Sequence, residues 1–339
     1  MIETTNEPPV LPAPLDQTSR VSGLVSRPRV RPKLPTAHLA GQVTVVQAHV
    51  PPPIPSSRRP TRLMALVNQK GGVGKTTTTV NLAEALSRLG QRVLAIDLDP
   101  QSHLTLHMGI EPEALDKSIY HLLTDPEVSA LEVAHEVHEN LVVVPAEVNL
   151  AGVEAELASF MASGRAQRVL ADKCAPLLTD PRGEPVFDYV LIDCPPSLGL
   201  LTINALALAR EVMVPMQAHF LALQGLSKLL ETVTLVKQAV NSDLVVSGMI
   251  LCMHESQTLL AGEVLADLNA FLDAARDQDV PWRDALVFGP PIRRNIKLAE
   301  CPSFGKTIFD YAPLCPGAND YHALAQAVVA QAAARVGHV

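Results

Sequence analysis

The strongest constraint on the fold of this chain is a glycine-rich stretch, QKGGVGKTT, at residues 69–77. It follows a short apolar run, LMALVN (63–68), which predicts a buried strand, and it leads into TTTTVNLAEALSRLG (76–90). That segment has apolar residues at helical spacing and ends at Gly90, so it predicts a helix. Glycines between a strand and a helix let backbone N–H groups converge on phosphate oxygens at the positive end of the helix. We therefore predict a loop that binds nucleotide phosphates.

The predicted loop consists of Gly71, Gly72, Val73, Gly74, Lys75, Thr76 and Thr77. In this pattern the lysine reaches the β- and γ-phosphates and the hydroxyl that follows it ligates Mg²⁺, so we assign these roles to Lys75 and Thr76. The general pattern GxxxxGK[ST] has a glycine where this chain has Gln69, and a second lysine, Lys70, stands directly before the glycines.

The rest of the chain alternates between apolar runs and helical patterns. Strands are predicted at RVLAID (92–97), LVVVPA (141–146), FDYVLID (187–193), EVMVPM (211–216) and LVVSGMI (244–250), and helices near 199–210, 222–239, 259–276 and 318–336. Aromatic residues make up only 4% of the chain against 47% apolar residues, which suits aliphatic strands covered by alanine-rich helices. We predict an α/β fold: a doubly wound, mostly parallel sheet with helices on both faces.

The first 61 residues have a different character from the remainder. Residues 1–62 hold twelve of the 28 prolines and carry eight basic against three acidic side chains, Arg62 included, a net charge of +5 that leaves −13 for the remainder. No helical periodicity of the kind that a helix-turn-helix module needs is present. We predict a disordered, basic, proline-rich leader at 1–61 before a nucleotide-binding domain at 62–335. The leader is either an inert tether or a segment that binds an anionic partner.

Composition also bears on where the protein acts. The five cysteines are scattered without a CxxC pair, and the N-terminal MIETTNEPPVLPAP lacks the basic end and apolar stretch of a secretory signal. No run approaches the eighteen apolar residues that a spanning helix requires. We therefore expect a cytoplasmic protein with no membrane partner.

Three aspartates follow predicted strands. Asp97 ends the run 92–97 and Asp99 stands two residues later, and Asp193 ends the run 187–193. Ligand groups gather at the carboxyl ends of parallel strands, so these acids can converge on one nucleotide. Mg²⁺ bound to phosphates needs only one or two protein carboxylates, and we assign that role to Asp193.

The motif KGGxGK[ST], with Lys70, resembles the deviant Walker A group that includes the ParA and MinD ATPases. Further blocks extend the resemblance. DLDPQ (97–101) is similar to the ParA switch I, and DCPPSLGLLTINAL (193–206) is similar to its switch II. RNIKLAECPSFGKTI (294–308) and YAPLCPGANDY (311–321) are similar to the C-terminal stretch of the family. Four blocks in the family's order identify a Soj/ParA-type partition ATPase.

The resemblance implies an ATP hydrolase whose cofactors are ATP and Mg²⁺. It implies that Lys70 acts on the nucleotide of the partner subunit in an ATP-bound homodimer, that Asp99 serves hydrolysis and that Asp193 is the Walker B acid. The dimer is then expected to bind double-stranded DNA non-specifically at the nucleoid, and a ParB-type centromere-binding partner to stimulate hydrolysis and release. The process served would be segregation of a chromosome or plasmid.

The expected DNA surface departs from the family. The arginine of the family's D-x-R-T segment is Gln257 here, whereas I-P-R-N becomes Ile292-Arg293-Arg294-Asn295, with one more positive charge. We predict that Arg293, Arg294 and Lys297 contact DNA, with Lys306 as a further candidate.

Two other functions stay open from the sequence. One is a MinD-like or other cargo-positioning ATPase, and the other is a nucleotide-gated adaptor with negligible turnover. His103 and His107 lie four residues apart without an evident third ligand, so we interpret them as surface or core histidines rather than a metal site.

Overall fold

The computed structural model describes residues 60–161, 165–218, 222–255 and 259–336. The predicted leader therefore lies outside the described residues, as does Gln257. The strands are β1 (Arg62–Leu66), β2 (Val93–Asp97), β3 (His135–His138), β4 (Leu141–Val144), β5 (Tyr189–Asp193), β6 (Glu211–Met216), β7 (Val245–Leu251) and β8 (Leu286–Phe288).

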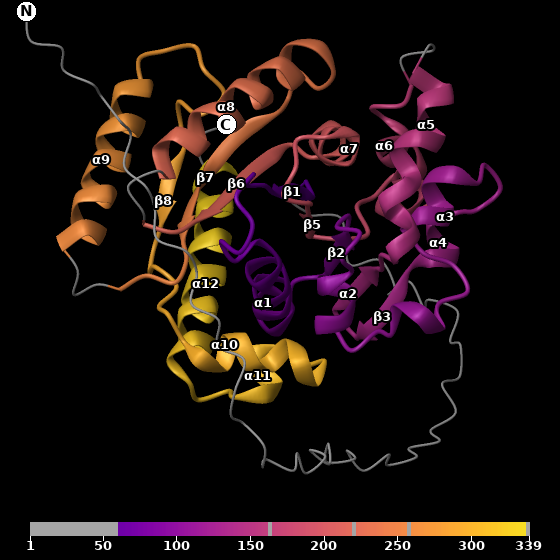
Figure 1. The fold of residues 1–339 in the computed structure, drawn as a ribbon, viewed down its shortest axis with the longest axis horizontal. Helices are drawn as coiled ribbons and strands as arrows, with labels where there is room; N and C mark the ends of the chain where they lie inside the picture. The colour runs from indigo at the N-terminus through magenta and orange to yellow at the C-terminus, as the bar shows by residue number, and fades with distance from the viewer. Residues whose placement is uncertain (1–59, 162–164, 219–221, 256–258, 337–339) are drawn as a thin grey trace, which may run out of the picture. The chain divides into compact units, whose positions relative to one another are not determined.

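These strands form one sheet in the order β3-β4-β2-β5-β1-β6-β7-β8 (Figure 1). The pairs are parallel except β3 with β4, which is antiparallel. From the central β1, the chain first builds β2, β4 and β5 on one side and then β6, β7 and β8 on the other. The predicted doubly wound, mostly parallel sheet is confirmed. Its topological switch point lies beside β1, where open α/β sheets bind ligands at the strands' carboxyl ends.

Helices cover both faces of the sheet. They are α1 (Lys75–Arg88), α2 (His103–His107), α3 (Ile119–Thr124), α4 (Ala130–Val133), α5 (Val153–Met161), α6 (Val169–Leu178), α7 (Leu200–Leu208), α8 (Ala222–Ala239), α9 (Leu259–Ala275), α10 (Ile296–Glu300), α11 (Ile308–Tyr311) and α12 (Pro316–Val336). Short 3₁₀ turns are η1 (Pro112–Ala114), η2 (Val148–Gly152) and η3 (Cys301–Phe304).

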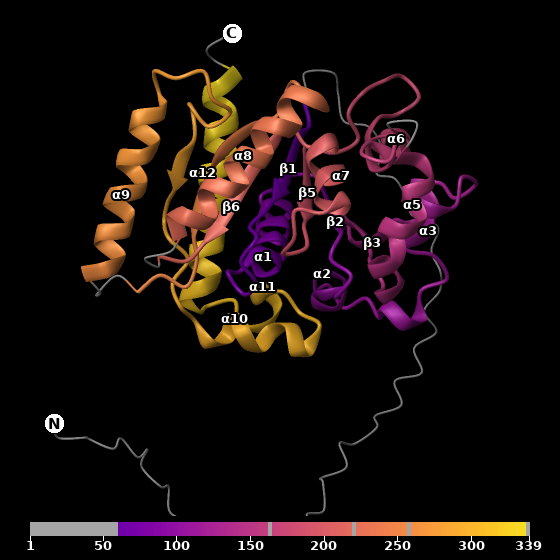
Figure 2. The ribbon, with the colours of Figure 1, turned by 45° about the horizontal axis from the view of Figure 1, so that its top comes forward.

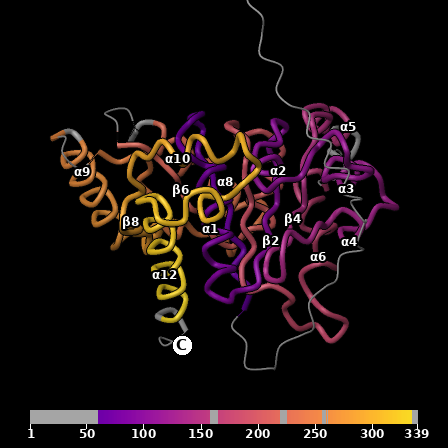
Figure 3. The backbone as a smooth tube through the Cα atoms, turned by 90° about the horizontal axis from the view of Figure 1, so that it is seen from below, coloured from indigo at the N-terminus to yellow at the C-terminus, as the bar shows by residue number. Residues whose placement is uncertain are grey.

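Alternate residues of each strand pack against different helices. Met64 and Leu66 of β1 belong to a buried cluster with α1, α2 and α10 to α12. Ala65 belongs to the cluster on the other face, with α3 to α9. Figures 1 and 2 show α1 beside α12, and Figure 3 shows α1 between α12 and α2. The phosphate-loop helix is thus enclosed by the C-terminal part of the chain.

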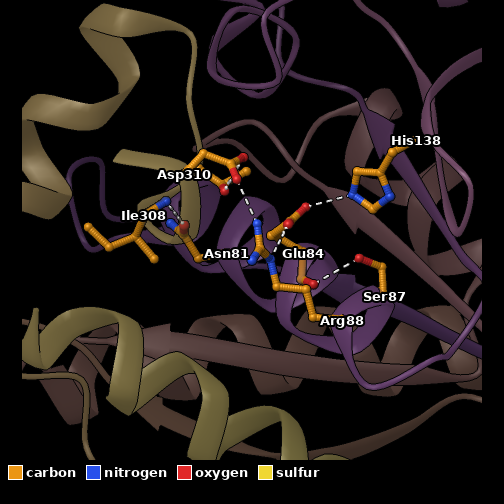
Figure 4. A network of polar contacts seen from close by, with 8 residues as sticks. Asn81, Glu84, Ser87, Arg88, His138, Ile308 and Asp310 are labelled. Atoms are coloured by element: carbon orange, nitrogen blue, oxygen red, sulfur yellow. Dashed lines mark hydrogen bonds and ion pairs between the residues drawn. The ribbon is translucent and has the colours of Figure 1, made fainter. Parts of the chain in front are cut away.

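Polar contacts fix α1 against its neighbours (Figure 4). Asn81 accepts a 2.8 Å hydrogen bond from the backbone N–H of Ile308, and Arg88 forms a 2.6 Å ion pair with Asp310. Glu84 pairs with Arg88 and, at 2.9 Å, with His138 of β3. Burial favours a higher pKa for Glu84, but the hydrogen bonds from His138 and Arg88 outweigh it and hold that pKa below its usual value. The helix is therefore tied to both the β3 edge and α11.

Arg62 requires a correction to the sequence analysis, which counted it among the basic groups of the leader. The structure places it in β1, buried, where its guanidinium donates to the Glu211 carboxylate at 2.7 Å and to the Val328 carbonyl at 2.7 Å. This arginine is neutralised inside the fold because a buried cation requires an anionic partner. It joins the first strand to the last helix.

Candidate nucleotide site

The phosphate loop has the backbone conformation that its glycines predict. Gly72 and Gly74 have φ values of 71° and 96°, in the left-handed region that favours glycine. Gly74 is also the residue from which α1 starts. A Cβ at Gly71 or Gly72 would meet no protein atom within 4 Å, so the loop borders open space. This is the cradle in which a phosphate group would meet backbone N–H groups at a helix N-terminus.

Lys75, Thr76 and Asp193 come together at this helix start. The Thr76 hydroxyl donates a 2.6 Å hydrogen bond to Asp193 Oδ2, and the Thr79 hydroxyl lies 3.2 Å from Oδ1. Lys75 is largely buried, and this burial lowers its pKa, although Asp193 and Asp99 oppose the shift. The structure therefore brings Asp193 against the adjacent residues Lys75 and Thr76, although 117 positions separate it from Thr76 in the sequence. The sequence analysis did not assign Thr79 to the site. The one indication in the sequence is that Thr79 lies one helical turn after Lys75.

Burial raises the pKa of Asp193 to about 8, with the Asp97 carboxyl as the next cause. An isolated buried carboxylate is unstable, and a divalent cation nearby would reverse this shift. The hydroxyl of Thr76 and the carboxylate of Asp193 are the hard oxygen donors that Mg²⁺ prefers. These residues fit the metal that accompanies a nucleotide, whose chemical contribution is to neutralise phosphate charge.

Asp97 and Asp99 occupy different environments although they are two residues apart. Asp97 is fully buried, and its carboxylate accepts the backbone N–H of Asp99 at 3.1 Å and both the N–H and the hydroxyl of Thr105, at 2.9 and 2.7 Å. Burial raises the pKa of Asp97 to about 6. Asp99 follows the strand and accepts the N–H of Gln101 at 3.0 Å. Asp97 thus faces inward and is paired with Asp193 in the β2–β5 register.

Lys70 lies on the exposed side of the loop. Its backbone N–H donates to Asn68 Oδ1 at 3.0 Å, and the Asn68 amide in turn donates to the Pro215 carbonyl at 2.8 Å. Gln217 donates to the Gly72 carbonyl at 3.0 Å. Side chains from the ends of β1 and β6 therefore shape the loop, and the sequence analysis assigned neither Asn68 nor Gln217 to the site.

The three predicted DNA-contacting residues lie on and just before α10, and each has an acidic partner. Arg293 forms an ion pair of 2.7 Å with Asp320, whose side chain is only 5% exposed. Arg294 pairs with Glu255 at 2.6 Å, and Lys297 pairs with Glu300 at 2.9 Å. The cluster is therefore less basic than its sequence suggests.

A tight contact joins α2, which follows Asp99 in the chain, to η3, which follows Lys297. Buried His107 lies 3.3 Å from Cys301 Sγ, and burial lowers the pKa of its imidazole to about 4. Gly109 and Gly305, both with positive φ, approach so closely that a Cβ on Gly109 would lie 3.1 Å from the Gly305 carbonyl oxygen. His107 is thus a core residue, whereas His103 is exposed.

Comparison with known proteins places this site in a family. The family model described as "AAA domain" matches residues 61–246. The sporulation initiation inhibitor protein Soj of Bacillus subtilis is 40% identical over 270 residues, which are 79% of this chain and 98% of that protein. The chromosome-partitioning ATPase Soj of Thermus thermophilus is 42% identical over 274 residues, 81% of this chain and 98% of its own.

Solved structures agree with this result. A Mycobacterium smegmatis protein described as cobyrinic acid a,c-diamide synthase, with bound ADP and magnesium, has a TM-score of 0.64 and 35% identity, covering 79% of this chain and 94% of its own. The cell division ATPase MinD of Pyrococcus furiosus has a TM-score of 0.61 over 80% of this chain and 99% of its own, and at 23% identity it supports the fold alone.

The relatives, together with the loop that the structure describes, make this chain an ATP hydrolase whose cofactors are ATP and Mg²⁺. It belongs to the AAA domain family and, within that family, to the Soj/ParA chromosome-partitioning ATPases.

Proposed function

We propose that this ATPase dimerises on ATP, binds double-stranded DNA without sequence preference and is released when a ParB-type partner stimulates hydrolysis. Its cargo is a chromosome or plasmid, and it acts in the cytoplasm at the nucleoid. The observation that carries the proposal is the convergence of Lys75, Thr76 and Asp193 at the start of α1, in a chain about 40% identical to the Soj proteins.

The proposal assigns a role to each residue of the site. Residues 71–77 bind the phosphates, with Lys75 on the β- and γ-phosphates, and Thr76 and Asp193 hold Mg²⁺. Asp99 orients the attacking water. Lys70, exposed on the loop, reaches the partner subunit's nucleotide. We also propose the division into a leader at 1–61 and an ATPase domain at 62–335.

The DNA step rests on Arg293, Arg294 and Lys297. Their ion pairs lower the free charge of a monomer, so DNA phosphates must compete with Glu255, Glu300 and Asp320. A dimer doubles the number of phosphate contacts, and DNA affinity depends steeply on that number. Weak binding by the monomer and strong binding by the ATP-bound dimer would follow.

The test is binding of the purified full chain to non-specific duplex DNA with ATP, with ADP and without nucleotide, over a salt series. The proposal requires binding that needs ATP, weakens with salt and is lost in Lys70→Ala. A dimer that forms on ATP but never binds DNA would contradict it.

Two outcomes would favour the other functions. Recruitment to lipid vesicles in a flotation assay would indicate a MinD-like system. Within the ranges that the structure describes, no helix is long and apolar enough to cross a bilayer. Turnover that stays near zero with DNA and partner present would indicate a nucleotide-gated adaptor.

A further inference from the structure

Thr105 of α2 is a fully buried residue that contacts the carboxylate group of Asp97. Its backbone N–H and its hydroxyl both donate to Asp97 Oδ2, at 2.9 and 2.7 Å. The same hydroxyl oxygen lies 2.9 Å from the backbone nitrogen of Ala146, just beyond β4. One side chain thus joins the last residue of β2 to the loop after β4.

The direction of these hydrogen bonds is fixed by chemistry. The backbone N–H of Ala146 can only donate, so the Thr105 oxygen must accept from it. The hydroxyl proton is then committed to Asp97, which receives it at Oδ2. The side chain of a threonine or serine at position 105 satisfies both partners, whereas an apolar residue of the same size keeps only the backbone hydrogen bond to Asp97.

Asp97 uses its other oxygen to hold the backbone of Asp99. Oδ1 accepts the backbone N–H of Asp99 at 3.1 Å. The orientation that Thr105 gives to the Asp97 carboxylate therefore determines where the main chain of Asp99 lies. Residues that orient the groups doing the chemistry through an intervening side chain are costly to lose: in metal sites such a loss typically lowers activity 10- to 100-fold.

We propose that Thr105 is a positioning residue for ATP hydrolysis: through Asp97 it fixes the backbone of Asp99 relative to the nucleotide. This rests on the proposed role of Asp99 in hydrolysis. Thr105 does not touch the phosphate loop in any contact that the structure records among the described residues. The hydroxyl is therefore expected to affect the rate of the chemical step and not the affinity for MgATP.

The test compares Thr105→Val, which keeps the shape and removes the hydroxyl, with Thr105→Ser, which keeps the hydroxyl. Turnover at saturating MgATP, KM and the affinity for a fluorescent ATP analogue are measured on the full chain. We expect kcat of Thr105→Val to fall about 10- to 100-fold with little change in KM or nucleotide affinity, and Thr105→Ser to restore most of the rate.

The control is Thr124→Val in α3, where the lost hydroxyl donates to the Tyr120 carbonyl at 2.9 Å on the other face of the sheet. It should leave kcat unchanged. Should Thr105→Val fail to fold, Thr105→Ala, which also removes the hydroxyl, provides the same comparison. A near-normal kcat in either folded variant, or equal losses in Thr105→Ser and Thr105→Val, overturns the proposal.

Asp99→Asn separates this inference from the proposed function. Loss of turnover in Asp99→Asn with normal turnover in Thr105→Val would overturn the positioning role alone. Normal turnover in Asp99→Asn would overturn the role of Asp99 itself, and the positioning proposal would fall with it.

Discussion

The Thr76 hydroxyl donates to Asp193 Oδ2 at 2.6 Å, and this contact joins the first turn of α1 to the end of β5. The hydroxyl and the carboxylate that we propose as Mg²⁺ partners are thus held next to each other. In the protein without metal, however, this buried carboxylate is unstable as an anion, since burial raises its pKa to about 8.

The stability of the metal-free protein should therefore fall as the pH rises from 6.5 to 8. The folded state binds the Asp193 proton up to about pH 8, whereas the unfolded chain releases it near pH 3.8, so the free energy of unfolding decreases across this window. One proton corresponds to about 1.4 kcal/mol per pH unit, so we expect a loss of about 1.5 kcal/mol, or roughly 3–6 °C in Tm.

Asp193→Asn is the matched variant, because its side chain has the same shape and carries no charge. Thermal unfolding without Mg²⁺ or nucleotide should give a flatter pH profile for this variant and a higher Tm than the wild type at pH 8. His138, whose pKa Glu84 raises, shifts both proteins in the same direction, so it cancels in the difference. Parallel profiles would show that Asp193 is not the group responsible.

Lys70→Ala should separate nucleotide binding from turnover. The Lys70 side chain is exposed, and only its backbone N–H has a recorded contact within the loop, to Asn68. We expect nearly unchanged ATP affinity, loss of the ATP-dependent dimer and a fall in turnover of about 10³-fold, the scale for a cation supplied in trans. Lys228→Ala, which removes an exposed lysine of α8, is the control and should behave as wild type in sedimentation and hydrolysis assays.

Glu300→Gln should strengthen DNA binding, because it removes the carboxylate that pairs with Lys297 at 2.9 Å. Lys297→Ala and Arg294→Ala should each weaken binding to all sequences alike and reduce the slope of log K against log salt by about 1. Fluorescence anisotropy over a salt series measures these changes. Arg182→Ala, which breaks an exposed ion pair with Asp180, should change neither quantity. Unaltered affinity in Glu300→Gln would contradict a role of Lys297 in DNA contact.

Gly109→Ala should destabilise the protein more than Gly90→Ala. Both glycines have nearly equal positive φ, 76° and 78°, so both variants carry a backbone cost of about 1 kcal/mol. Only at Gly109 would the new methyl group meet backbone, the Gly305 carbonyl oxygen at 3.1 Å, whereas at Gly90 it would meet nothing within 4 Å. We expect at least about 1 kcal/mol more loss for Gly109→Ala in urea unfolding. Equal losses would mean that α2 and η3 separate easily.

The elements that are marked by a local run of aliphatic residues could be predicted from the sequence. The strands that were predicted are present, because each is a continuous aliphatic run covered on both faces. β3 was not predicted, since HEVH contains one apolar residue and lies at a partly exposed edge of the sheet. β8 has only three residues, too few for a period to be recognised.

The candidate site likewise contains some residues that a local sequence pattern reveals and others that it does not. The phosphate loop is contiguous, and Asp193 stands at the end of an apolar run, so both could be found from the sequence. The acidic partner of Arg293 is Asp320, 27 residues away, and Thr105 meets Ala146 from a distance of 41 residues. Pairings of this kind depend on how the elements pack, and no local pattern indicates them.

Helix α1 contacts residues that lie beyond the segment matched by the family model. Residues 61–246 match the family model, yet α1 meets the backbone of Ile308, the carboxylate of Asp310 and, through Thr78, the hydroxyl of Tyr321 at 3.1 Å. All three partners come from beyond that range. A chain cut at residue 246 would remove these three partners from the phosphate-loop helix, together with the apolar residues of α10 to α12 that pack in the same buried cluster. The segment that the family model matches is therefore shorter than the part of the chain that packs around the phosphate-loop helix.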